Sequence, residues 1–181
     1  MKAGVARADF ERVRIRAACL TALTVVVLLS AGAGTATASG QSVQTLGAAN
    51  ELERQLLGEL NEIRRAHGLV PLRLSLPLSS AADSHSRSMA TFGFFAHSSR
   101  DGSAFWKRVQ RFYGRRGSGM WSVGENLLWS TTGIGATEAL KLWMESPGHR
   151  KNILTPEFNR VGIGVMRGGL YGRMFTQNFA G

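Results

Sequence analysis

Two histidines and one carboxylate stand in short stretches rich in small and polar residues. His97 lies in FFAHSS, Glu125 in VGENLL and His149 in SPGHRKN. Imidazole and carboxylate groups suit zinc and related divalent metals, and three such ligands leave a coordination position for water. The same trio could instead act as acid and base. No pair forms a local motif such as H-E-x-x-H, so spacing alone does not decide between these chemistries.

Each of the three residues also has a structural interpretation. His149 could bond a backbone carbonyl from the first turn of a short helix. His97 could pack as a loop histidine on Phe94 and Phe95, and Glu125 could accept hydrogen bonds from backbone amides at the end of a strand. These interpretations stay open beside metal binding and proton transfer.

Helical spacing of apolar residues predicts the elements that would position the trio. Asn50 and Glu53 form a capping-box pattern at the start of the first helix, and Gly68 ends it. The predicted longer helices are residues 50–67, residues 78–92, a segment capped by Asp101 and residues 135–145.

A short fifth helix is predicted over residues 147–154, where His149 lies. Pro147 disfavours helical geometry at Ser146, so the preceding helix should end there. Ser146 can then serve as the N-cap of the short helix, with Pro147 in its first position.

Three stretches are typical of strands. VGENLLWS is one, and RVGIGVM and MFTQNFAG flank RGGLYGR as two strands of a hairpin, whereas YGRRGSGMWS is predicted to be a loop. Helices at both ends with strands between and after them predict an α/β sandwich whose sheet is at least partly antiparallel.

The first 38 residues are typical of an export signal. A basic segment precedes the apolar run AACLTALTVVVLLSAGAG, and ATA at residues 36–38 is a small-x-small cleavage pattern. We expect a signal peptide over residues 1–38, a flexible lead-in over 39–52 and one domain over 53–181. The apolar run is long enough to span a bilayer if cleavage fails, and it contains Cys19, the only cysteine of the chain. The exported domain would therefore have no disulfide bond.

The chain is basic, with a formal net charge of +10. Five basic and two acidic residues fall within the signal, which leaves about +7 on the processed protein. Such an excess favours anionic partners such as wall polymers or lipid headgroups. The basic residues are scattered and form no recognisable nucleic-acid motif, so we expect no nucleic-acid partner.

Five stretches together resemble a known family. FFAHSSRDGS, GENLLW, LWMESPGHRKNIL, RVGIGV and FTQNFAG occur in the order found in the CAP superfamily (cysteine-rich secretory, antigen-five and pathogenesis-related-one proteins), and the chain is similar to its bacterial, disulfide-free branch. The resemblance covers roughly residues 53–180. It implies a three-layer α-β-α sandwich with a small, largely antiparallel central sheet and a central cleft.

The resemblance also implies a cleft site. Many members carry two histidines and two acidic residues there, and some bind a divalent metal. His97, Glu125 and His149 match three of the four positions. A metal at these residues would be zinc first, with magnesium or calcium as alternatives.

The fourth position departs from the family pattern. In many eukaryotic members the acidic residue lies three positions after the helix tryptophan, which here is Ser146. Glu145 lies two positions after Trp143, about 100° away around a helix, but its side chain could turn inward because the helix should end there.

The first functional hypothesis is therefore an exported, monomeric binding module for a lipid, sterol or cell-envelope ligand, with an optional metal. It would contact a membrane only through its signal segment, if that segment is retained. The alternative is a metal-assisted hydrolase, such as a peptidase, in which His97, Glu125 and His149 position metal and water. The third hypothesis is a structural domain that binds no small ligand. The chain has no G-x-S-x-G elbow, and no thiol would remain after processing.

Overall fold

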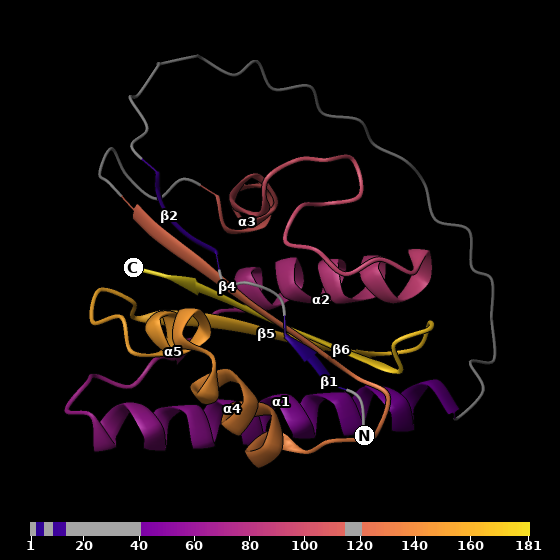
Figure 1. Cartoon of the computed structure of the whole chain (residues 1–181), viewed down its shortest axis with the longest axis horizontal. Coiled ribbons are helices and arrows are strands. Elements are labelled where there is room, and N and C mark those ends of the chain that lie inside the picture. The colour runs from indigo at the N-terminus through magenta and orange to yellow at the C-terminus, as the bar shows by residue number, and fades with distance from the viewer. Residues whose placement is uncertain (1–2, 6–8, 14–40, 115–120) are drawn as a thin grey trace, which may run out of the picture.

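The chain folds as an α-β-α sandwich, which confirms the predicted fold class (Figure 1). The computed structural model describes residues 3–5, 9–13, 41–114 and 121–181, with side chains from residue 51 onward. One side of the sheet is covered by α1 (Gln41–Ala66), α4 (Ala136–Glu145) and α5 (Pro147–Ile153). The other side is covered by α2 (Leu76–Phe92) and α3 (Phe105–Tyr113).

The sheet is mixed but mostly antiparallel. Its strands are β1 (Ala3–Val5), β2 (Asp9–Val13), β3 (Arg73–Leu74), β4 (Trp121–Ser130), β5 (Arg160–Arg167) and β6 (Arg173–Ala180). They lie in the order β1-β4-β6-β5-β3, and β2 also pairs with β4. Among the described strands only β3 and β5 pair in parallel, and β5 and β6 form the predicted hairpin.

The register of β4 against β6 determines which side chains meet. Glu125 lies opposite Asn178, and Asn126 lies opposite Gln177. Because successive side chains of a strand point to opposite faces, the first pair faces α2 and α3 and the second faces α1, α4 and α5. The sheet thus separates two polar groups that are adjacent in sequence.

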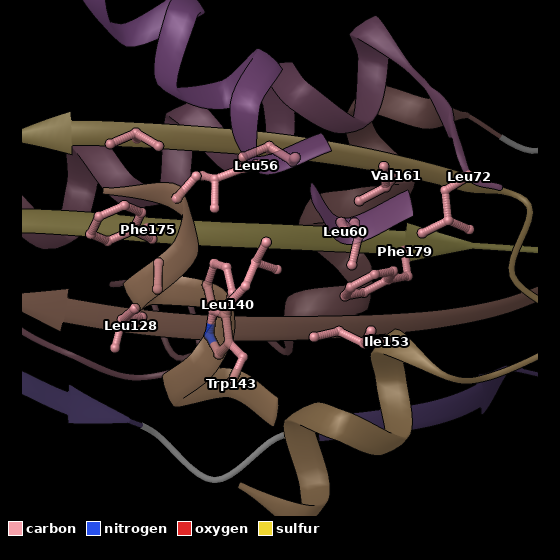
Figure 2. Packing of buried hydrophobic residues seen from close by; sticks show 14 of the residues in the cluster. Leu56, Leu60, Leu72, Leu128, Leu140, Trp143, Ile153, Val161, Phe175 and Phe179 are labelled. Atoms are coloured by element: carbon pink, nitrogen blue, oxygen red, sulfur yellow. The ribbon is translucent and has the colours of Figure 1, made fainter. Parts of the chain in front are cut away.

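The largest apolar cluster fills the space between the sheet and α1, α4 and α5 (Figure 2). Trp143 lies at its centre with no exposed surface, and its indole N–H donates to the Leu127 carbonyl at 3.2 Å. On the other face the sheet allows α2 to approach very closely. A Cβ at Gly162 would lie 2.0 Å from the Leu78 carbonyl carbon, so only glycine fits there.

Two predicted helix starts were wrong. Helix α1 begins at Gln41, so most of the expected lead-in over 39–52 is helical; its glutamines, leucine and alanines are good helix formers, and extending an existing helix is cheap. Helix α3 begins at Phe105 after an Ala104 N-cap. Asp101 instead closes a turn before α3, where its carboxylate accepts the Ser103 N–H at 2.9 Å.

Only part of the predicted export signal is described. Residues 3–5 and 9–13 pair antiparallel with β4, whereas residues 14–40, with the apolar run and the cleavage pattern, lie outside the described residues. Most of the predicted loop after α3 lies outside them too, although β4 begins at Trp121 rather than Val123. None of the helices in the described ranges is long and apolar enough to cross a membrane. Signal cleavage remains a prediction.

Candidate functional site

A buried charged group centres on Glu125 in the middle of β4. The carboxylate has no exposed surface, and its Oε1 lies 2.9 Å from Nδ1 of His97 in the loop after α2. Its Oε2 lies 2.5 Å from Nη2 of Arg108, on α3. Because an ionised carboxylate only accepts hydrogen bonds, both nitrogens donate to it. We call Glu125, His97 and Arg108 the polar centre.

Arg108 is held as firmly as the carboxylate that it contacts. Its Nη1 donates to Ser99 Oγ at 2.7 Å, and both of its terminal nitrogens lie 3.3 Å from the His97 carbonyl oxygen. Only 5% of the side chain is exposed. Sequence reasoning missed Arg108, although a signal exists. Phe105 lies three positions before Arg108 and four before Val109, so both side chains neighbour its own, and all three are buried.

Asn178 on β6 adds a further donor. With the amide oriented so that both of its ends are satisfied, its nitrogen lies 3.0 Å from Glu125 Oε2 and its oxygen accepts the Ala82 N–H at 3.2 Å. Burial pushes the pKa of the Glu125 carboxyl upward, but the charge of Arg108 and the bond from His97 outweigh it and hold the pKa below its ordinary value. The carboxylate is therefore ionised and fully occupied.

His149 is buried at the start of α5, as the short-helix prediction implies. Its Nδ1 lies 2.8 Å from Ser146 Oγ, so its partner is a side chain and not the backbone carbonyl considered above. Its Nε2 has no hydrogen-bond partner among the described residues. Burial, with the nearby His97 charge, lowers the pKa of His149 to about 4, so the ring is neutral near pH 7.

An amide network on the other face of the sheet secures α5. Asn126 donates to Gln177 Oε1 and to the His149 carbonyl, both at 3.2 Å. Asn152 donates to Asn126 Oδ1 at 2.9 Å and to the Glu125 carbonyl at 3.2 Å. These bonds fix the backbone positions of His149 and Glu125 relative to each other.

Glu145 does not join this group. Its side chain is 60% exposed and lies 3.9 Å from Lys141 Nζ, one turn away on α4. The helix continues through Glu145, so the inward turn that the sequence left open does not occur. Ser146, the position of the family's fourth residue, instead contacts the His149 ring.

The expected metal ligands do not fit a metal. Within the described ranges, no group of three or more His, Cys, Asp or Glu side chains is arranged to hold an ion. Glu125 accepts hydrogen bonds from His97 and Arg108, and the fixed positive charge of Arg108 beside the carboxylate opposes a second cation there. His97 and Glu125 are in direct contact as the resemblance implies, but as a hydrogen-bonded pair.

His85 on α2 is a buried neighbour that sequence reasoning did not assign to the site. Its Nε2 lies 2.8 Å from the Ala96 carbonyl oxygen, so it fixes the backbone just before His97. Burial is the largest cause that lowers the pKa of His85 to about 4, although the Glu125 charge opposes it. A neutral His85 can therefore donate this bond near pH 7.

A second candidate site is an open groove between α1 and α4, on the other side of the sheet. It has a volume of about 410 Å³. Its walls contain three apolar side chains, Ile63, Leu140 and Met144, and its rim is polar. The hydroxyl of Thr137 on α4 donates to Glu59 Oε1 on α1 at 3.1 Å and so ties the two walls together. We call this feature the α1/α4 groove.

The sandwich, with a glutamate in β4 and a histidine at the start of α5, is typical of a CAP-type domain. The cysteine-rich secretory protein family matches residues 57–179. The chain belongs to this CAP family, and as a one-cysteine chain it fits the disulfide-free bacterial version.

Two curated relatives come from Bacillus subtilis (strain 168). The uncharacterized protein YkwD is 32% identical over 129 residues, which are 71% of this chain and 47% of YkwD. The uncharacterized membrane protein YlbC is 30% identical over 127 residues, which are 70% of this chain and 34% of YlbC. The chain thus spans about half of one relative and a third of the other.

Solved structures share the fold. An extracellular protein with an SCP domain from Bacillus anthracis has a TM-score of 0.60 at 29% identity, over 80% of this chain and 44% of that one. An outer surface protein of Borrelia burgdorferi has a TM-score of 0.62 at 18% identity, over 72% of this chain and 92% of that one. The second likeness shows the fold alone. A domain similar to this chain therefore occurs in a protein described as extracellular.

Proposed function

We propose that this protein is an exported, monomeric binding module that takes an acyl chain or similar lipid-like ligand in the α1/α4 groove. The observation that carries the proposal is the apolar lining of that groove. Its volume of about 410 Å³ lies within the range typical of small-ligand pockets. Burying an apolar chain there would remove both ligand and wall from water, which is favourable by about 25 cal/mol per Å² of apolar surface.

The charged side chains that line the groove are Glu59, Glu62 and Lys141. Lys141 lines the groove, is 72% exposed and contacts Glu145 only at 3.9 Å. An exposed pair at that distance contributes little, so its ammonium can turn to a carboxylate or phosphate. A fatty acid supplies the one carboxylate that this ammonium can meet, whereas a lipid with several negative charges would also face Glu59 and Glu62.

The hydrolase alternative is supported less well. A general base must be free to accept a proton, and Glu125 has both oxygens bonded and a lowered pKa. Export is supported by the basic and apolar N-terminal pattern and by relatives described as extracellular.

Titration with a fluorescent long-chain fatty acid tests the proposal. We expect saturable binding that unlabelled fatty acid displaces and that Met144→Glu abolishes, because the new charge would lie in the apolar groove. Lys107→Glu on α3 is the matched control and should bind normally. No saturable binding, or equal loss in both variants, would reject the groove. Peptide or ester hydrolysis lost in Glu125→Gln would instead support the hydrolase.

A further inference from the structure

We propose that one end of the sandwich docks on an anionic lipid surface, with Leu170 as the side chain that enters the lipid. We call Phe92, Arg100, Arg167 and Leu170 the hairpin end. This contact does not use the N-terminal apolar run. The inference goes beyond the proposed function, because the hairpin end shares no residue with the α1/α4 groove and does not depend on fatty-acid binding there.

The hairpin end forms where the turn between β5 and β6 packs against the last turn of α2 (Figure 1). The contact is close, since a Cβ at Gly169 would lie 2.2 Å from the Ala90 carbonyl oxygen. A Cβ at Gly93, directly after Phe92, would lie 3.8 Å from Leu170 Cδ1. Leu170 therefore lies beside the end of α2 that carries Phe92.

The two apolar side chains of the hairpin end remain in water. Leu170 is 85% exposed and Phe92 is 52% exposed. Tyr171, which follows Leu170, is instead partly buried against Trp129, with ring centroids 5.3 Å apart. The fold thus uses the aromatic ring of the turn and leaves its leucine for a contact outside the chain.

The charges around these side chains are positive. Residues 84–100 and 158–181, which include most of α2 and the whole hairpin, contain five arginines and no aspartate or glutamate. The Arg100 guanidinium lies over the Phe92 ring, 3.8 Å from its centroid, and Arg167 is exposed at the end of β5. Within the described part of the chain, neither of these arginines forms an ion pair. Exposed apolar side chains beside free cations are suited to an interface of anionic headgroups and acyl chains.

Two carboxylates lie close to the hairpin end and are already bonded. The Asp101 carboxylate accepts the Ser103 N–H at 2.9 Å, and Glu53 Oε1 accepts the Val165 N–H at 3.2 Å. Burial, with the charge of Asp83, raises the pKa of Glu53 to about 7, so this group carries only part of a negative charge near pH 7. These carboxylates therefore do not cancel the positive charge of the arginines.

A lipid surface fits the hairpin end better than other anionic or apolar partners. A wall polymer would pair with the arginines but would leave Leu170 and Phe92 in water. A headgroup layer offers anions to the arginines and acyl chains to the apolar side chains. A second copy of the chain is disfavoured, because two such ends would bring like charges together.

The test places a polarity-sensitive fluorophore at the tip of the full chain. Leu170→Cys is combined with Cys19→Ser, because Cys19 is the only cysteine. Vesicles of about three parts phosphatidylcholine and one part phosphatidylglycerol should shift the emission to the blue and raise it at least about twofold. Leu76→Cys, labelled in the same way, is the matched control, because Leu76 is 73% exposed and lies at the opposite end of α2.

The local readout separates docking of the hairpin end from attachment through the N-terminal apolar run. Attachment alone would give no difference between the probes at positions 170 and 76. Arg100→Glu combined with Arg167→Glu should remove most of the change at position 170, and added salt should reduce it. Arg150→Glu, exposed on α5, should leave it intact.

No change at position 170, or the same change at positions 170 and 76, overturns the proposal. So does an equal change with vesicles of phosphatidylcholine alone. A change caused by soluble polyphosphate without vesicles would assign the hairpin end to an anionic polymer and reject the lipid. A change that grows with protein concentration in the absence of lipid would assign it to a second copy and would likewise reject the lipid.

Discussion

The polar centre and the α1/α4 groove lie on opposite sides of one sheet and differ in how completely their groups are satisfied. In the polar centre every oxygen of Glu125 has a donor and Arg108 has three acceptor groups. The groove is open to solvent between the partly buried Ile63 and Met144, and the rim lysine contacts Glu145 only at 3.9 Å. A site whose groups are already paired stabilises the fold, whereas a site whose surface is left open can gain energy from a ligand.

The largest effect should come from breaking the polar centre. Arg108→Ala leaves the Glu125 carboxylate buried without its cation, and we expect a loss of about 3–5 kcal/mol in the free energy of unfolding. Urea denaturation measures it. Arg111→Ala, exposed on the same helix, should change stability by less than about 0.5 kcal/mol. A loss below about 1 kcal/mol in Arg108→Ala would show that the ion pair is not a structural centre.

A smaller loss of stability should follow when the pH is lowered. The folded pKa of His149 is about 4 against an ordinary value of 6.5, so the unfolded chain binds its proton first as the pH falls. The contribution of the neutral His149 ring to the free energy of unfolding is complete above pH 6.5 and decreases as the pH falls toward 4. Between pH 6.5 and pH 5 the loss is about 2 kcal/mol.

Comparison with His149→Gln isolates that contribution. Urea denaturation at pH 7 and pH 5 should show a fall in wild type that exceeds the fall in the variant by about 2 kcal/mol. His67→Gln, at the exposed end of α1, is the matched control. Equal falls in wild type and His149→Gln would mean that the buried ring is not held neutral.

Removing the side-chain partner of the His149 ring should lower the free energy of unfolding by a smaller amount. Ser146→Ala deletes the bond at 2.8 Å to Nδ1, and we expect a loss of about 1 kcal/mol in the free energy of unfolding. Ser80→Ala, exposed on α2, should be neutral or slightly stabilising. A neutral Ser146→Ala would indicate that the bond contributes little to the orientation of His149.

The smallest effect should come from the rim of the groove. Lys141→Glu should weaken fatty-acid binding by at most about fivefold and leave stability unchanged, because exposed ion pairs contribute about 1 kcal/mol or less. The weakening should shrink as salt is added. Fluorescence titration at low and high salt measures it, beside Lys107→Glu. An affinity equal to wild type would exclude Lys141 from headgroup recognition.

The sequence predicted the elements better than the contacts. Periodicity placed most of the helices and the hairpin, and Pro147 correctly marked the boundary between α4 and α5. The two helix starts were predicted wrongly for general reasons. Good helix formers extend a helix at little cost, and an aspartate can hydrogen-bond within a turn instead of capping a helix.

The candidate site was predicted only in part for a different reason. The sequence grouped His97 and Glu125 with His149 as a trio, and the structure places the first two in contact. Arg108, the partner that neutralises Glu125, stands in a helix with no motif around it. Glu145 has the acidic side chain that the fourth position requires, but this side chain lies on the exposed side of α4, near Lys141. The α1/α4 groove depends on how two distant helices pack, and no local pattern shows that.

The most direct measurement is a side-by-side titration of Arg108→Lys and Met144→Glu with the same fluorescent fatty acid. Arg108→Lys keeps a cation in the polar centre, and Met144→Glu places a charge in the wall of the groove. Because Met144 also packs against the core, thermal unfolding must first show that this variant is folded. We expect wild-type affinity in Arg108→Lys and at least about a tenfold loss in Met144→Glu. Loss of binding in Arg108→Lys with normal binding in Met144→Glu would contradict it and place the ligand at the polar centre.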